Sequence, residues 1–128
     1  MKILGIDFGL TNFGLSFTEG RLVEPFGQLK IKLLSEALDQ LESICRKNKI
    51  KKIVIGLPGG KLKNTVVGFS RQLEQRTSLP VIFQPEEFSS KEAVEKMVEI
   101  NKPLKKRQQQ EHMVAACIIL QKYLDEQT

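Results

Sequence analysis

Three side chains in this 128-residue sequence could carry metal-ion or acid–base chemistry, and they are Asp7, Glu86 and His112. Asp7 ends an otherwise apolar stretch at residues 2–6 and is followed by Phe8-Gly9. A carboxylate at the end of a buried strand is costly to bury unless it is paired or bound to a metal. The same residue could instead cap the turn to the next strand, as aspartate often does. The residues around Asp7 leave both interpretations open.

Two adjacent acids, Glu86 and Glu87, follow the apolar stretch Val81-Ile82-Phe83 after Gln84-Pro85. Acids at the carboxyl end of a strand lie where ligand sites gather in open α/β sheets. A polar loop ahead of a helix would also carry acids, because the positive end of the helix favours them. On local grounds alone the loop interpretation is favoured.

His112 is the single histidine, and it lies beside Glu111 near the start of the last expected helix. A lone histidine in such a place is more often a surface or packed residue than a ligand. A role in a site therefore depends on Asp7 and Glu86 being its neighbours. The two cysteines, Cys45 and Cys117, stand apart within helical patterns, so packed reduced thiols are expected and a zinc site is not.

The hydrophobic pattern indicates which elements must position these side chains. Strands are predicted where apolar residues alternate or run continuously, at 2–7, 13–17, 21–32, 53–57 and 79–83. The third strand is interrupted near Pro25 and Gly27. The first three strands follow each other through tight links, which predicts an antiparallel meander.

Helices are predicted where apolar residues recur at helical spacing, at 35–47, 64–75, 89–102 and 108–126. Asn64 is the expected N-cap of the second, and Ser89 and Glu92 have the spacing of a capping box for the third, which Pro103 ends. The first helix places Leu34, Leu38, Leu41 and Cys45 inward. In the last helix the expected inward stripe is Met113, Cys117, Leu120 and Leu124.

A meander followed by alternating helix and strand makes a mixed sheet with helices packed on its faces. The expected fold is therefore an α/β fold of the ribonuclease H-like kind, with a mixed five-stranded sheet and helices on both faces. No linker or repeat interrupts the pattern, so residues 1–128 are expected to form a single domain.

The composition is typical of a soluble globular protein, with 41% apolar and 27% charged residues. No apolar run approaches the roughly 20 residues that a membrane span needs. The first residues read as a strand and leave no room for a signal peptide, so a cytoplasmic location is expected.

The net charge of +5 suits a nucleic-acid partner, although such an excess is weak evidence by itself. Part of it lies in the basic segment that leads into the His112 helix, and we predict that this segment binds phosphates. A solvated surface is the alternative. The predicted nucleic-acid-binding residues are Lys105, Lys106 and Arg107. A separate basic cluster, for which no binding is predicted, comprises Lys47, Lys49, Lys51 and Lys52.

Four motifs occur in the order in which they occur in one known family. The first is Gly5-Ile6-Asp7-Phe8-Gly9, and the second is Ile53-Val54-Ile55-Gly56-Leu57-Pro58, which is similar to the family's VVGLP. The third and fourth are Glu86-Glu87-Phe88-Ser89-Ser90-Lys91-Glu92-Ala93 and Ala115-Ala116-Cys117-Ile118-Ile119-Leu120-Gln121-Lys122-Tyr123-Leu124. Along nearly its whole length the chain resembles the YqgF/RuvX family of Holliday junction resolvases and pre-16S rRNA nucleases.

The resemblance implies metal-dependent hydrolysis of phosphodiester bonds in structured nucleic acid, either precursor ribosomal RNA or branched DNA. It implies Mg²⁺ or Mn²⁺ held by Asp7 and Glu86, with His112 at the position of the family's third acid. His112 would be a third ligand or a general acid/base, and an imidazole favours Mn²⁺. The three side chains are predicted to converge within about 10 Å at one sheet edge. A monomer or weak homodimer is expected.

The chain departs from the family pattern at several polar positions besides His112. Leu10 stands where the family has threonine, Glu87 stands where it has arginine, and residues 59–63 replace a longer acidic loop. These changes support a second hypothesis, a catalytically weakened or inactive relative that binds RNA or a ribosome-assembly partner. A third hypothesis is a relationship to the actin, hexokinase and heat-shock ATPase superfamily, because residues 6–12 also look like its phosphate-binding turn. The members of that superfamily are far longer than this chain.

Overall fold

The computed structural model describes residues 1–85 and 104–127, and the side chains of residues 1–85 and 111–127. Five strands and three helices lie in these ranges. The strands are β1 (Ile3–Asp7), β2 (Asn12–Thr18), β3 (Val23–Lys30), β4 (Lys52–Leu57) and β5 (Val81–Pro85). The helices are α1 (Leu34–Lys47), α2 (Leu62–Thr77) and α4 (Leu104–Glu126).

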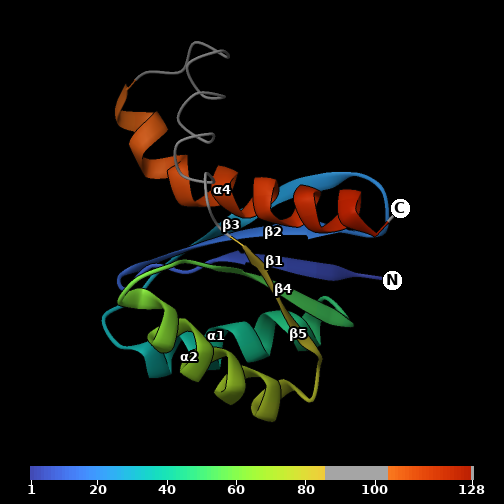
Figure 1. Cartoon of the computed structure of the whole chain (residues 1–128), viewed down its shortest axis with the longest axis horizontal. Helices are drawn as coiled ribbons and strands as arrows, with labels where there is room; N and C mark the ends of the chain where they lie inside the picture. The colour runs from blue at the N-terminus through green and yellow to red at the C-terminus, as the bar shows by residue number, and fades with distance from the viewer. Residues whose placement is uncertain (86–103, 128) are drawn as a thin grey trace.

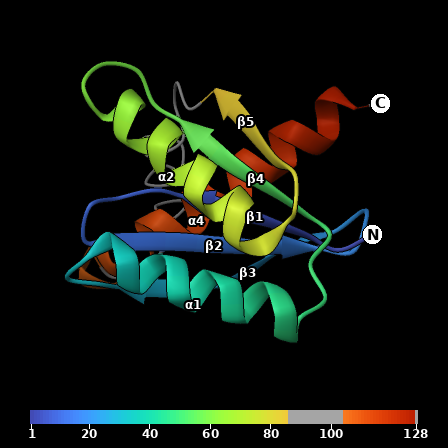
Figure 2. The ribbon, with the colours of Figure 1, turned by 90° about the horizontal axis from the view of Figure 1, so that it is seen from below.

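The strands form one mixed sheet in the order β3-β2-β1-β4-β5. The β1–β2 and β2–β3 pairs are antiparallel, whereas β1–β4 and β4–β5 are parallel. Helix α4 covers one face of the sheet, and α1 and α2 lie together on the other (Figures 1 and 2). The predicted mixed five-stranded sheet with helices on both faces is confirmed.

The parallel strands β1, β4 and β5 end at the same edge of the sheet, where β2 begins and β3 ends. We call this edge the carboxyl edge. It lies to the left in Figure 1, where β4 runs into α2. Ligand sites of α/β proteins gather at such an edge, so its side chains are the ones to examine for chemistry.

Alternation along β1 divides its side chains between the two helical layers. Leu4 and Ile6 pack in the core beneath α1 and α2, and Ile3 packs with residues of α4. Because successive side chains point to opposite faces, Gly5 and Asp7 also face the α4 layer. On the α1–α2 side of the core, Phe8 packs edge-on against Phe13 and Phe69, and the rings of Phe13 and Phe69 are tilted against each other.

Helix α4 approaches β1 and β2 closely because those strands carry small residues beneath it. A Cβ atom on Gly14 would overlap the carbonyl group of His112, and one on Gly5 would lie 3.1 Å from the carbonyl oxygen of Ala116. The Ser16 hydroxyl donates to that same oxygen at 2.7 Å. The helix face that docks here is Ala115, Ala116, Ile119 and Leu120. The expected stripe is therefore partly wrong, because Met113, Cys117 and Leu124 are only half-buried.

Several element boundaries differ from the sequence predictions. Helix α2 begins at Leu62, so Asn64 lies inside the helix and is not its N-cap. Helix α4 begins at Leu104 rather than at 108, since residues 104–107 are good helix formers. The pairing of β2 with β3 shifts register between Leu15 and Ser16, opposite the predicted interruption. The helix expected at 89–102 lies outside the described residues.

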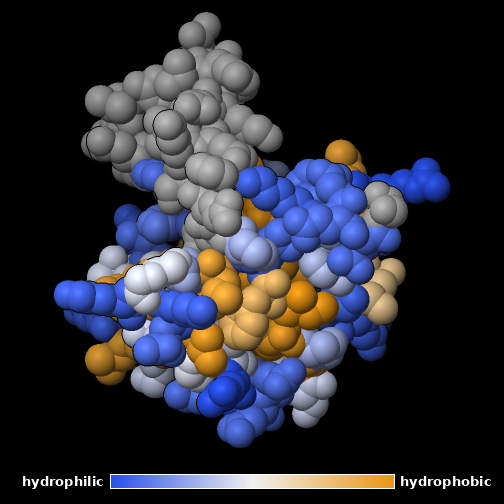
Figure 3. All heavy atoms as spheres, viewed as in Figure 1, coloured by the Kyte–Doolittle hydropathy of each residue, from blue (hydrophilic) through white to orange (hydrophobic). Residues whose placement is uncertain are grey.

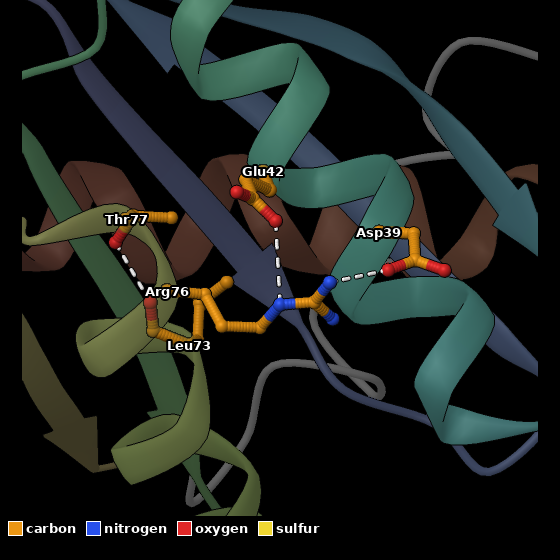
Figure 4. A network of polar contacts seen from close by, with 5 residues as sticks. All are labelled: Asp39, Glu42, Leu73, Arg76 and Thr77. Carbon is orange, nitrogen blue, oxygen red and sulfur yellow. Dashed lines mark hydrogen bonds and ion pairs between the residues drawn. The ribbon is translucent and has the colours of Figure 1, made fainter.

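Helices α1 and α2 are joined at the surface by ion pairs (Figure 4). The Arg76 guanidinium donates to Asp39 and also lies 3.2 Å from a carboxylate oxygen of Glu42. In the same turn of α2, Thr77 Oγ1 donates to the carbonyl oxygen of Leu73 at 2.7 Å. Exposed pairs of this kind contribute at most about 1 kcal/mol each, so they add little to the stability of the fold.

Strand β5 forms one outer edge of the sheet and keeps apolar side chains partly exposed. Val81 and Ile82 are half-buried, and Phe83 is 36% exposed. Figure 3 shows an apolar area in the middle of the face on which β5 lies. Within residues 1–85 and 104–127 no helix combines the length and the apolar character needed to cross a bilayer.

Candidate active site

Asp7 is the last residue of β1, and its side chain is only 2% exposed. On one side it pairs with Gly14 of β2, and β4 follows on the other side of β1. A carboxylate in this position cannot reach bulk water freely, so it needs a partner that compensates the loss of hydration.

That partner is His112 of α4. Its ring nitrogen Nδ1 lies 2.6 Å from Oδ2 of Asp7, although 105 residues separate the two in the sequence. The close packing of α4 on Gly14 brings the His112 imidazole down to the sheet. A Cβ atom on Gly9 would lie 3.3 Å from Cε1 of His112. Asp7 therefore does more than cap a turn, because it binds a side chain from the opposite end of the chain.

The hydrogen bond with Asp7 raises the pKa of His112 above its ordinary value near 6.5. Burial of the imidazole acts in the opposite direction, and the negative charges of Asp7 and Glu111 add to the increase. The imidazole is consequently protonated more readily than a free histidine. When His112 is protonated, its positive charge balances the buried charge of Asp7.

The pKa of His112 can be measured directly because the chain has no other histidine. We expect its Cε1–H proton resonance to titrate above pH 6.5 in the metal-free protein, because Asp7 favours the protonated ring. In Asp7→Asn the pKa should be lower than in the wild type, since the charge of Asp7 is removed and only the charge of Glu111 then opposes the effect of burial. An unchanged pKa in this variant would contradict the pairing.

The donor set of this pair suits a divalent cation. A carboxylate oxygen and an imidazole nitrogen are ligands that Mn²⁺ accepts readily, and Mg²⁺ prefers the oxygen. In the described part of the chain no three His, Cys, Asp or Glu side chains cluster closely enough to complete a site. The two donors fit a cation, which would compete with the proton that they share.

Glu86, the predicted second ligand, lies outside the described residues. The residue described immediately before it is Pro85, the last residue of β5, which lies at the carboxyl edge. Strand β5 is two neighbours from β1, which corresponds to about 10 Å at the usual strand spacing. The structure thus brings Asp7 and His112 together, and convergence with Glu86 remains a prediction.

The predicted phosphate-binding residues Lys105, Lys106 and Arg107 lie in the first turns of α4, ahead of His112. Their side chains are outside the described part, so their role also remains a prediction. The sequence reasoning missed Gly5, Gly14 and Ser16, which seat α4 beside Asp7. The sequence did contain a signal for this close helix packing, because these small residues lie on the same face of two strands that were predicted to pair.

The family model for RuvX, described as a Holliday junction resolvase, matches residues 1–126. A relative from Syntrophomonas wolfei named "Putative pre-16S rRNA nuclease" is 34% identical, over 98% of this chain and 94% of its own. A relative of the same name from Protochlamydia amoebophila is 31% identical, over 97% of this chain and 93% of its own.

Solved resolvase structures share the fold at low sequence identity. The Fowlpox virus resolvase in complex with Holliday junction DNA has a TM-score of 0.67 at 13% identity, with 98% of each chain covered. RuvC of Thermus thermophilus has a TM-score of 0.60 at 14% identity, covering 93% of this chain and 90% of its own. The fold predicted from the sequence is confirmed, and the chain belongs to the RuvX family.

Proposed function

We propose that this protein is a metal-dependent nuclease that hydrolyses phosphodiester bonds in structured nucleic acid, either at the 5′ end of pre-16S rRNA or in branched DNA junctions. The observation that carries the proposal is a buried carboxylate at the carboxyl edge, Asp7, in direct contact with His112. Family membership and the names of the relatives supply the class of substrate.

Asp7, Glu86 and His112 are the proposed cation ligands. A bound Mg²⁺ or Mn²⁺ would supply an activated water and stabilise the leaving oxygen. The alternative role proposed for His112, in place of ligation, is general acid/base. Because Asp7 engages Nδ1, the imidazole presents Nε2 as the atom that takes or gives a proton at the substrate. Asp7 then also fixes the orientation of the ring.

Lys105, Lys106 and Arg107 are proposed to hold phosphates as the nucleic acid approaches His112, because lysine and arginine contacts position a backbone without reading its sequence. Processing of ribosomal RNA would place the protein in the cytoplasm. A monomer or weak homodimer is the proposed form.

Cleavage of precursor rRNA fragments and of four-way DNA junctions, each with Mg²⁺ and with Mn²⁺, tests the proposal. We expect activity to be greater with Mn²⁺ than with Mg²⁺, because imidazole is a softer ligand than carboxylate. His112→Asp should raise the Mg²⁺-dependent rate, and His112→Ala should lower the rate with both ions. Cleavage by His112→Ala at the wild-type rate would show that the imidazole takes no part.

A second candidate function is a binding module that no longer cleaves. The pairing of Asp7 with His112 favours it, since a protonated imidazole would balance the buried carboxylate without a cation. Titration with Mn²⁺ distinguishes the two, because a bound paramagnetic ion should broaden the His112 resonance. An unbroadened resonance, together with no cleavage of either substrate, would support the binding module.

A further inference from the structure

The turn between β4 and α2 carries two lysines to the carboxyl edge. Strand β4 ends at Leu57 beside β1, and the chain continues through Lys61 and Lys63 into the start of α2 (Figure 1). Gly60 adopts φ +70°, and the Lys63 amide donates to the carbonyl oxygen of Gly60 at 3.3 Å. This turn determines the backbone positions of Lys61 and Lys63 at the carboxyl edge.

A third lysine lies at the same edge on the other side of β1. Lys30 is the last residue of β3 and pairs with Asn12 of β2, two residues before Gly14, the partner of Asp7. Because residues two apart on a strand share a face, Lys30 is on the Asp7 face of the sheet. Strands β3 and β4 are three spacings apart, which is about 14 Å. A nucleic-acid strand rising about 3.4 Å per nucleotide covers this in about four nucleotides.

These three lysines are exposed, and in residues 1–85 and 111–127 no acidic side chain forms an ion pair with them. Among the ion pairs of residues 1–85 and 111–127, Lys2 is paired with Glu19, and none involves Lys30, Lys61 or Lys63. The first turn of α2 also contains no acidic residue. Their positive charges are therefore available to a partner that carries regularly spaced negative charge.

We propose that Lys30, on the α4 face of the carboxyl edge, and Lys61 and Lys63, on the α2 side of the same edge, bind backbone phosphates of a nucleic-acid strand that crosses the edge at Asp7. This inference rests on the proposed function and deepens it, because it states the path that the nucleic acid takes over the carboxyl edge. Phosphates of RNA and of DNA share the recognised chemistry.

Binding should be measured by fluorescence anisotropy in EDTA, across a series of NaCl concentrations. The two probes are an RNA hairpin bearing the 5′ end of precursor 16S rRNA and a four-way DNA junction. Lys61→Gln with Lys63→Gln should weaken binding by at least about tenfold at 0.1 M salt. The slope of log affinity against log salt should become shallower by about 1.4 to 1.8, as expected for two lost phosphate contacts. Loss of affinity for both probes is expected if both nucleic acids follow this path, and loss for one probe alone identifies the nucleic acid that follows it.

Lys47→Gln with Lys51→Gln is the matched control, because both lysines are exposed and the Lys51 amide bonds to Lys2 at the opposite edge of the sheet. The control should keep its affinity within about twofold and its slope unchanged. Equal losses in the two double variants, or no loss in Lys61→Gln with Lys63→Gln, would overturn the inference. Failure of the wild-type protein to bind either probe would overturn the proposed function as well.

Discussion

Asp7→Asn is expected to abolish cleavage while the protein keeps its fold. An amide has nearly the shape of the carboxylate, but it carries no negative charge and is a poor ligand for Mg²⁺ or Mn²⁺. The loss should be at least about 1,000-fold, the upper range for removing one preorganised electrostatic group. The measurement is the single-turnover cleavage rate with saturating Mn²⁺, on whichever substrate the wild-type protein cleaves.

The stability of Asp7→Asn separates loss of chemistry from loss of fold. The amide oxygen of the substituted side chain could still accept a hydrogen bond from His112 Nδ1, so we expect the variant to lose only about 1 kcal/mol. The raised pKa of His112 stabilises the wild-type fold fully below pH 6.5, and this contribution disappears as the pH rises through the folded-state pKa. The stability difference should therefore shrink toward alkaline pH.

Asp39→Asn is the control for the same chemical change. Asp39 is exposed on α1, where it pairs with Arg76 away from the carboxyl edge. This variant should cleave at the wild-type rate. Cleavage by Asp7→Asn at a rate near that of Asp39→Asn would remove Asp7 from the site, and melting of Asp7→Asn near room temperature would make its inactivity uninformative about chemistry.

The sheet could be predicted from the sequence because its strands carry strong local signals. Residues 53–57 are continuously apolar, as a strand covered on both faces must be, and β1 shows the same character up to Asp7. The stripe of α1 was also predictable, since Leu38, Leu41 and Cys45 recur at helical spacing and are buried. Burial of Cys45 raises the pKa of its thiol to about 11, as expected for a packed residue without chemistry.

Other features depend on contacts that hydrophobic periodicity does not show. The start of α2 follows a turn at Gly60 and has no side-chain cap, so the prediction of Asn64 as the N-cap is wrong. The inward face of α4 is chosen by the close approach to Gly14, which favours Ala115 and Ala116 over Met113 and Cys117. The contact between His112 and Asp7 is likewise tertiary, and only the order of the family motifs suggested it.

Gly14→Ala should cause the largest loss of stability among single-methyl changes at the site. The new methyl group would overlap the carbonyl of His112 and lie 2.5 Å from the amide nitrogen of Met113. Both are helix backbone atoms, so the helix must move as a unit and cannot relieve the overlap by a rotamer change. We expect a loss of about 3 kcal/mol, which lowers the melting temperature by roughly 10 °C.

Displacement of α4 should also separate His112 from Asp7, so the pKa of the imidazole in Gly14→Ala should return toward 6.5. Gly27→Ala is the matched control, because a Cβ on Gly27 of β3 would have no atom within 4 Å. The control should melt within about 3 °C of the wild type and keep the raised pKa. If Gly14→Ala has the same melting temperature as Gly27→Ala and His112 keeps its raised pKa, the close packing of α4 on β2 does not position His112.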